Sequence, residues 1–201
     1  SGVCRGHTTG APITMIVWNS DQKSTDYENL KTKLRPGHSD YPAMMKYNYF
    51  NDYRGGGRFS GRLTATHVMG GAIARKLLKV TLGIETNSFT TQIGKIKMEK
   101  KFDEKMINSI YKNEVRCPEE NTAKKMKDSI LDARKKGDSL GGIIESITTN
   151  VPVGIGEPIF GSLESDLSKA IFSIPSVKGV EFGSGFEGSK LFGSENNDLY
   201  T

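Results

Sequence analysis

Apolar residues recur at helical spacing over residues 60–82, in the middle of the chain. The positions that share one face are Ala65, Val68, Met69, Ala72, Ile73 and Leu77. A stripe that repeats every three to four residues is typical of an amphipathic helix, so we predict one long helix here. Similar spacing predicts shorter helices over residues 105–112, 119–135 and 163–172.

Four other segments are rich in β-branched or alternating apolar residues, which favours extended strands. They cover residues 12–18, 88–98, 140–153 and 177–182, and the second alternates in the manner of an edge strand. Strands and helices do not alternate regularly enough for a doubly wound parallel sheet. We therefore expect a single α+β domain, built from packed layers, over residues 1–201.

The positive charge of the chain is concentrated in one segment. The formal net charge is +5, and residues 95–136 alone contain eleven Lys and two Arg against eight acidic residues. The interspersed acids indicate solvated helix faces, and a nucleic-acid-binding surface is the alternative interpretation. No apolar run is long enough to cross a membrane, so we expect neither a membrane nor a nucleic acid as partner.

Cysteine and histidine are scarce. Cys4 and Cys117 lie far apart, which allows one disulfide at most and favours reduced thiols in a cytosolic protein. The three histidines, His7, His38 and His67, have no cysteine or second histidine at ligand spacing. We therefore expect no structural zinc site.

The residues best suited to chemistry lie between positions 35 and 62. Four arginines (Arg35, Arg54, Arg58 and Arg62) accompany three consecutive glycines just before the long predicted helix. Glycine lets backbone N–H groups approach phosphate oxygens, while guanidinium groups and a helix N-terminus supply positive charge. We predict an anion-binding loop, which is not a nucleotide P-loop because no Gly-Lys-Ser/Thr follows.

His38 follows a Pro-Gly break beside these arginines. Imidazole exchanges a proton near neutral pH, so His38 is either a proton donor in the site or a turn residue bonded to backbone. Residues 193–198, Gly-Ser-Glu-Asn-Asn-Asp, carry amide and hydroxyl groups that suit a heterocycle. A polar loop that caps a helix is the simpler interpretation of that segment.

Seven strings in this chain together resemble the chorismate synthase family. They are HTTGAPI (7–13), RPGHSDY (35–41), DYRGGGRFSGR (52–62), DSLGGIIE (138–145), VPVGIGEPIF (151–160), SIPSVKGVEFGSGFEG (173–188) and GSENND (193–198). A single string would carry little weight, but seven in family order at compatible spacing are specific. The resemblance implies a layered β-α sandwich of the chorismate synthase type, with antiparallel or mixed sheets packed with helices.

The resemblance also implies an activity. The family members are carbon–oxygen lyases that eliminate phosphate from 5-enolpyruvylshikimate 3-phosphate to give chorismate, in the shikimate pathway of aromatic amino acid biosynthesis. By resemblance, Arg35 and Arg62 are ligands of the substrate anions, and His38 is the catalytic proton donor. The expected partner is thus a small phosphate-bearing molecule, and no metal is implied.

Reduced FMN is the cofactor that the resemblance implies, with NADPH as a candidate reductant. Arg58, Phe59 and Ser60 resemble one FMN-contact segment of the family, and Glu195 and Asn196 resemble a second. A cytoplasmic homotetramer is implied in the same way.

The chain departs from the family pattern at several points. The usual GGRSSARETA reads GGRFSGRLTA, so that Phe59 replaces a serine and Leu63 a glutamate. The family's Gly-Glu-Ser-His-Gly segment and its C-terminal Arg and Asp do not occur in these 201 residues. We expect the chain to be the central part of a longer polypeptide. An inactive or binding-only flavin- and anion-binding fragment of the same fold is the alternative, and a basic nucleic-acid-binding module is a weaker one.

Overall fold

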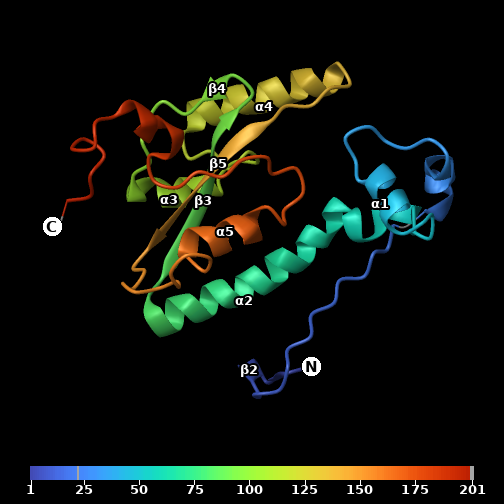
Figure 1. Cartoon of the computed structure of the whole chain (residues 1–201), viewed down its shortest axis with the longest axis horizontal. Coiled ribbons are helices and arrows are strands. Elements are labelled where there is room, and N and C mark those ends of the chain that lie inside the picture. The colour runs from blue at the N-terminus through green and yellow to red at the C-terminus, as the bar shows by residue number, and fades with distance from the viewer. Residues whose placement is uncertain (22, 200–201) are drawn as a thin grey trace. The chain divides into compact units, whose positions relative to one another are not determined.

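A computed structural model describes residues 1–21 and 23–199 of the chain (Figure 1). The chain divides into two compact units. The terminal unit comprises residues 1–71 and 154–201, and the central unit comprises residues 72–153. Helix α2 (Thr64–Leu82) begins in the terminal unit and ends in the central one.

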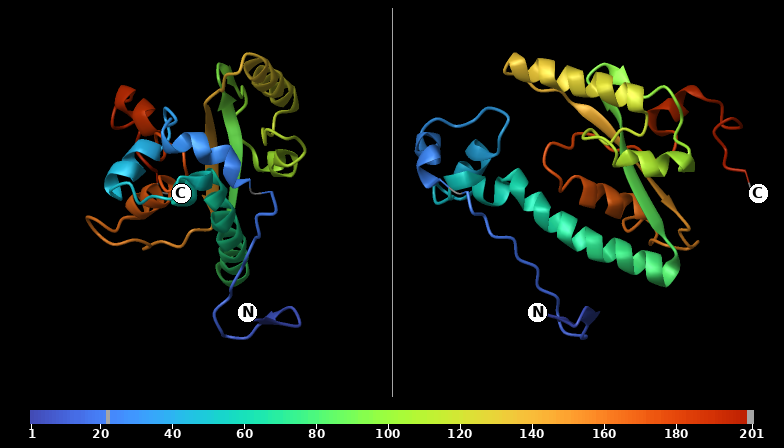
Figure 2. Two further views of the ribbon diagram at one scale, coloured as in Figure 1. Left: turned by 90° about the vertical axis from the view of Figure 1, so that its right-hand side faces the viewer. Right: turned by 180° about the vertical axis from the view of Figure 1, so that it is seen from behind.

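The central unit is built on a three-stranded antiparallel sheet in the order β4-β3-β5. Its strands are β3 (Glu85–Ile93), β4 (Ile96–Lys97) and β5 (Gly142–Thr149). The 3-10 turn η4 (Glu104–Met106) leads into the short helix α3 (Ile107–Ile110), and α4 (Glu120–Lys135) follows. Helices α3 and α4 cover the same face of the sheet (Figure 2).

The hydrophobic core of the central unit lies between this face of the sheet and the two helices. Phe89 of β3 is buried with Ile110 of α3, Cys117 and Met126 of α4. The ring of Phe89 stacks on Phe102 at a centroid distance of 4.2 Å. Strand side chains alternate between faces, so the helix-covered face takes the apolar residues.

The opposite face of β3 and β5 is polar. Two cross-strand pairs of hydroxyl groups lie there, Thr86 with Thr148 at 3.0 Å and Ser88 with Ser146 at 2.7 Å. Such pairs stabilise an antiparallel register without apolar burial. The alternation of polar and apolar residues in β3 therefore arises because one face of this central strand packs against the helices and the other carries hydroxyl pairs.

The lysine-rich segment forms a helix with mixed charge. In α4 the side chains of Thr122, Ala123 and Met126 face the core, and the lysines are exposed. Three lysines of this region form ion pairs, namely Lys124 with Glu120, Lys127 with Glu114 and Lys135 with Asp132. This arrangement is that of a solvated helix face, as the interspersed acids predict.

The terminal unit contains short elements. Strands β1 (Val3–Cys4) and β2 (His7–Thr8) form a small hairpin. The helical elements are η1 (Ser24–Lys31), α1 (Asp40–Lys46), η2 (Arg54–Phe59), η3 (Gly61–Leu63), α5 (Leu163–Ile171) and η5 (Gly185–Lys190). Ser162 caps α5, because its hydroxyl accepts a hydrogen bond from the backbone N–H of Ser165 at 3.2 Å.

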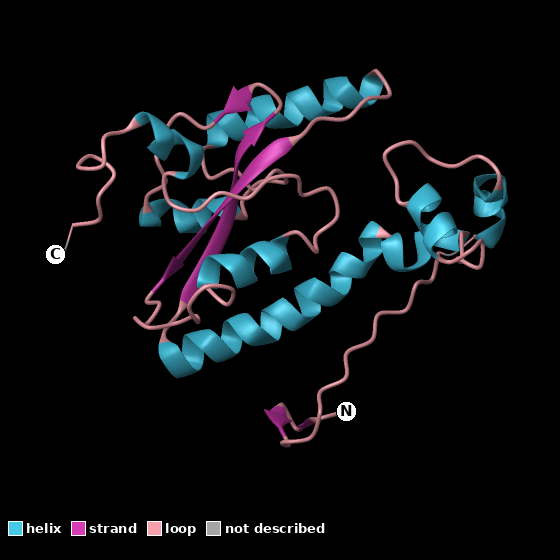
Figure 3. Cartoon of the chain, in the orientation of Figure 1, coloured by secondary structure: helices cyan, strands magenta, loops and turns pink. Residues whose placement is uncertain are grey.

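The structure confirms the α+β class and all four predicted helices, but it corrects three strands. Residues 12–18 and 177–182 form no strand, and the first segment is drawn as loop in Figure 3. Within the described residues neither segment has a ladder partner, and Trp18 remains 83% exposed. The predicted edge strand over 88–98 is instead the central strand β3 followed by a turn and β4.

Across residues 1–21 and 23–199, none of the helices combines the length and the apolar character that a membrane crossing requires.

Candidate active site

The first part of the site is the turn between Arg35 and Asp40. The Asp40 carboxylate accepts hydrogen bonds from the Arg35 backbone N–H at 3.1 Å, from Arg35 Nε at 2.8 Å and from Arg35 Nη2 at 2.9 Å. His38 Nδ1 lies 2.7 Å from Asp40 Oδ1. Because Asp40 stands in the first turn of α1, the helix fixes the carboxylate that gathers Arg35 and His38.

The second part of the site is the glycine loop, defined here as Arg54–Arg62. Gly55, Gly56 and Gly57 have φ angles of 66°, 79° and 49°, which side-chain-bearing residues rarely adopt. The loop then turns into η3, where the Ser60 hydroxyl accepts a hydrogen bond from the Arg62 backbone N–H at 3.2 Å. Three glycines therefore permit the tight reversal that precedes α2.

The glycine loop and the Arg35–Asp40 turn meet at Gly56, which is buried. A Cβ atom at Gly56 would lie 3.7 Å from His38 Nε2 and Cε1 and 3.6 Å from Ser60 Cβ. The imidazole edge opposite Asp40 thus faces the backbone of the loop. Segments separated by about twenty residues converge at one place, as the anion-site prediction requires.

Arg62 is held at the same loop. Its Nη2 donates to the Gly55 carbonyl at 2.6 Å, and its Nη1 donates to the Tyr27 hydroxyl of η1 at 3.4 Å. A Cβ at Gly55 would come within 2.8 Å of Arg62 Nη2. The guanidinium is therefore fixed against the loop, and its remaining N–H groups stay available to a ligand.

The four arginines are not equally available to an anion. Arg54 is paired with Asp52 at 2.9 Å, and Arg35 uses its Nε and Nη2 on Asp40. The Arg58 side chain is exposed and makes no hydrogen bond or ion pair with any other described residue. Arg58, Arg62 and the Nη1–Nη2 end of the Arg35 guanidinium are accordingly the donors that remain for a ligand.

Pairing with Arg35 keeps Asp40 ionised. Hydrogen bonds from the Arg35 guanidinium hold the pKa of the Asp40 carboxyl far below its usual range, and burial opposes this only in part. The Asp40 side chain is 11% exposed. The carboxylate is therefore a fixed negative charge behind His38 throughout the neutral range.

The structure brings together the sequence-predicted residues Arg35, His38, Ser60 and Arg62. Arg58 and Phe59 lie in the same loop at the end of η2, and the centroid of the tilted Phe59 ring is 6.4 Å from that of Tyr47.

Glu195 and Asn196 are held by local contacts instead. Glu195 accepts a hydrogen bond from the Phe192 backbone N–H at 2.9 Å, and Asn196 accepts one from the Ser184 hydroxyl. Within residues 1–21 and 23–199, no hydrogen bond or ion pair joins these two residues to the glycine loop. Their role as a second FMN-contact segment stays a prediction.

Sequence reasoning missed two residues of this site. Asp40 occurs two positions after His38 in the string RPGHSDY, and an acid that close to an arginine and a histidine was the available signal. The sequence indicates Gly56 only as one of three consecutive glycines in the anion-binding loop, and does not single it out. Its contact with His38 depends on the path of both turns, which no local pattern encodes.

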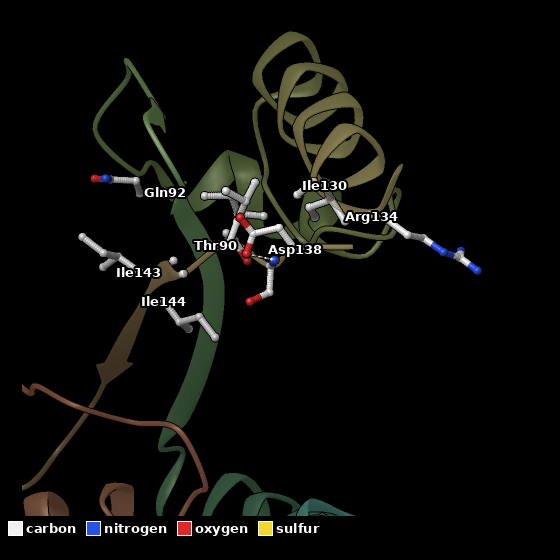
Figure 4. A pocket seen from close by; sticks show the side chains of 13 residues that line it. Thr90, Gln92, Ile130, Arg134, Asp138, Ile143 and Ile144 are labelled. Carbon is white, nitrogen blue, oxygen red and sulfur yellow. Dashed lines mark hydrogen bonds between the residues drawn. The ribbon is translucent and has the colours of Figure 1, made fainter. Parts of the chain in front are cut away.

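A separate cavity of about 460 Å³ lies in the central unit, between α4 and the β3–β5 pair (Figure 4). Its lining is largely apolar, with Ile130, Leu140, Ile143 and Ile144. In Figure 4 the guanidinium of Arg134 extends away from the other lining side chains. The cavity contains none of the predicted site residues and offers no cluster of cationic groups for a phosphate.

In the part of the chain that the structure describes, no three His, Cys, Asp or Glu side chains gather as a metal site would require.

Comparison with known proteins places these residues in a family. The sequence model described as chorismate synthase matches residues 1–201. A chorismate synthase of Dehalococcoides mccartyi (strain ATCC BAA-2100) is 52% identical over 200 residues, covering 100% of this chain and 55% of that protein. One of Korarchaeum cryptofilum is 53% identical over 198 residues, covering 98% of this chain and 55% of that protein.

A solved structure agrees with the sequence comparison. A crystal structure of chorismate synthase superposes with a TM-score of 0.67 at 32% identity, covering 78% of this chain and 50% of that one. The chain spans about half the length of the curated relatives it matches. On the match of the family model to every residue, the chain belongs to the chorismate synthase family.

Proposed function

We propose that the protein carrying this chain is a carbon–oxygen lyase that converts 5-enolpyruvylshikimate 3-phosphate to chorismate and phosphate, with reduced FMN as cofactor. The observation that carries this proposal is the convergence of Arg35, His38 and Arg62 at the glycine loop, in a chain of the chorismate synthase family. The same convergence supports a binding role for the loop.

The charge of the site suits the proposed substrate. Residues 35–62 contain five cationic and two acidic side chains, which gives three net positive charges with His38 neutral. The substrate bears a phosphate and carboxylates, and FMN bears a second phosphate. Donors fixed before the ligand arrives stabilise developing negative charge most effectively, and the bonds of Arg62 to Gly55 and Tyr27 provide that fixation.

The residues at the end of the glycine loop fit FMN. Arg58 has a guanidinium without a partner among the described residues, Phe59 exposes an aromatic ring and Ser60 lies against Gly56. These groups suit a phosphate, a flat heterocycle and a polar edge respectively. When bound, reduced FMN would lend electron density to the elimination and recover it, so that no net oxidation occurs.

In this proposal His38 is the proton donor, and the arginines bind the phosphate that leaves. The reaction breaks the carbon–oxygen bond to phosphate and one ring carbon–hydrogen bond, forms a carbon–carbon double bond, and releases phosphate and a proton. His38 in its protonated form would hold a proton on Nε2, the atom that faces the loop. Arg62 and the Nη1–Nη2 end of Arg35 would bind the substrate anions and orient the bond that breaks.

The proposal is tested with the full-length protein under anaerobic conditions, with 5-enolpyruvylshikimate 3-phosphate and chemically reduced FMN. We expect chorismate and phosphate to form in equal amounts. Reactions without flavin, or with FMN left oxidised, serve as controls. Flavin or substrate binding without phosphate release would instead establish a binding-only protein, and the enzymatic assignment would be withdrawn.

The family resemblance also supports a cytoplasmic homotetramer that receives its reducing equivalents from NADPH. Light scattering of the full-length protein tests the tetramer, and a monomer at micromolar concentration would contradict it. Turnover with NADPH in place of chemical reductant tests the source of electrons.

A further inference from the structure

Asp40, which the sequence-predicted site left out, contacts both Arg35 and His38. Its two carboxylate oxygens receive three N–H groups of Arg35, and Oδ1 lies 2.7 Å from His38 Nδ1. Both residues are only partly exposed, with His38 at 27% and Asp40 at 11%. A carboxylate with four donors fixes all of the groups that supply them.

The contact with Asp40 determines where the imidazole proton lies. A carboxylate oxygen and an unprotonated ring nitrogen repel each other at 2.7 Å, since both would present lone pairs. His38 Nδ1 therefore carries hydrogen and donates it to Asp40. Arg35 Nη2 also lies 3.3 Å from Nδ1, but a guanidinium has no acceptor atom, so this approach is not a hydrogen bond once Nδ1 is protonated.

A proton fixed on Nδ1 leaves Nε2 as the reactive atom of His38. In the neutral ring Nε2 is an acceptor, and in the charged ring it is a donor. Nε2 faces Gly56, where the missing side chain leaves 3.7 Å to the position of a Cβ. The reactive nitrogen thus points to the glycine loop, away from the ion pair.

Asp40 also restricts how Arg35 binds. The Nε and Nη2 groups form the guanidinium edge that grips oxyanions in a bidentate manner, and Asp40 occupies both. Three of the five N–H groups, two on Nη1 and the second on Nη2, are left at the end of the guanidinium for an incoming anion. Arg35 is therefore limited to end-on contact, and the direction of that contact is set by the carboxylate.

We propose that Asp40 is a positioning residue, which holds His38 as the Nδ1–H tautomer with Nε2 toward the glycine loop and presents only the Nη1–Nη2 end of the Arg35 guanidinium to the ligand. The effect on turnover rests on the proposed function, whereas the tautomer does not. Asp40 suits the task because Arg35 keeps its pKa low, so it is charged whether His38 is neutral or protonated. The stability that this ionisation confers is complete above the unfolded-state pKa of about 3.9 and is lost only as pH falls through the lower folded-state pKa.

The first test is the histidine tautomer in the full-length protein labelled with 15N-histidine. The His38 signals are assigned by their loss in His38→Ala. Long-range 1H–15N spectra at a pH where His38 is neutral should show Nδ1 protonated and Nε2 unprotonated. An Nε2–H tautomer in the wild-type protein would overturn the proposal without any variant or activity measurement.

The second test is Asp40→Asn, which keeps the shape and removes the charge. The amide oxygen can take the place of Oδ2 and accept from Arg35 Nε and the Arg35 backbone N–H, at the loss of the bond from Nη2 to Oδ1. The amide NH2 then stands beside His38 Nδ1, where it can only donate, and should convert the ring to the Nε2–H tautomer. We expect turnover to fall about 10- to 100-fold, as is usual when a supporting hydrogen bond behind a functional histidine is lost. Asp132→Asn, at an exposed ion pair with Lys135, is the matched control and should retain wild-type turnover.

The two readouts separate the possible failures. A changed tautomer with wild-type turnover would refute a role of Asp40 in the reaction. Reduced turnover with an unchanged tautomer would show that Asp40 does not act through His38. If the wild-type protein forms no chorismate, the proposed function fails, and the wild-type and Asp40→Asn spectra still decide whether Asp40 sets the tautomer.

Discussion

Replacing Gly56 by alanine tests whether the glycine loop must stay open beside His38. Gly56 has φ 79° and ψ −3°, a conformation that costs an L-residue about 1–2 kcal/mol. The new methyl would lie 3.6 Å from Ser60 Cβ and 3.7 Å from His38 Nε2, which is ordinary contact and adds no clash. We predict that the free energy of unfolding falls by about 1–2 kcal/mol, which lowers Tm by roughly 2–8 °C.

The effect of this methyl on catalysis should exceed its effect on stability. It would fill the space through which a ligand approaches His38 Nε2, and displacing reacting groups by about 1 Å costs about 100-fold in rate. Urea unfolding and steady-state turnover of full-length Gly56→Ala measure the two effects. Gly137→Ala is the control, because Gly137 has φ 68° with nothing within 4 Å of an added Cβ. Equal turnover in both variants would refute the placement of the site at this loop.

Three further predictions concern other contacts. Arg62→Ala should remove about 2–4 kcal/mol of transition-state stabilisation, which lowers kcat/KM by about 30- to 1,000-fold. A variant with the kcat/KM of the wild-type protein would exclude Arg62 from the site. Phe89→Ala should lower the free energy of unfolding by about 3–5 kcal/mol, because this side chain is buried in the core. The control Phe186→Ala, at an exposed position, should change it by less than about 0.5 kcal/mol. Urea titrations that give the two variants equal stability would contradict the described core. Burial raises the pKa of the Cys117 thiol, so iodoacetamide should modify the exposed Cys4 first, and mass spectrometry showing equal rates would disprove the burial of Cys117.

The helices were predictable because their signal is local. The stripe that begins near Ala65 and the mixed face of residues 119–135 each specify a helix without reference to the rest of the chain. Strands are defined by partners, so residues 12–18 carry a strand-like composition and form none. The alternation of β3 gave no indication of its central position, because hydroxyl pairs to β5 make its second face polar.

The candidate site was predictable to the extent that single motifs contain its residues. RPGHSDY supplied Arg35 and His38, and the glycine-rich string supplied Arg62. Neither string shows that Asp40 binds both members of the first pair or that Gly56 faces His38. Those contacts arise from the relative placement of two turns, which is a tertiary property.

The decisive experiment for the location of the site is a crystal structure of the full-length protein with 5-enolpyruvylshikimate 3-phosphate and FMN. We expect the substrate to lie against the glycine loop, in contact with His38 Nε2, Arg62 and the Nη1–Nη2 end of Arg35, with Asp40 still bonded to His38 Nδ1. Substrate bound away from residues 35–62 would contradict it.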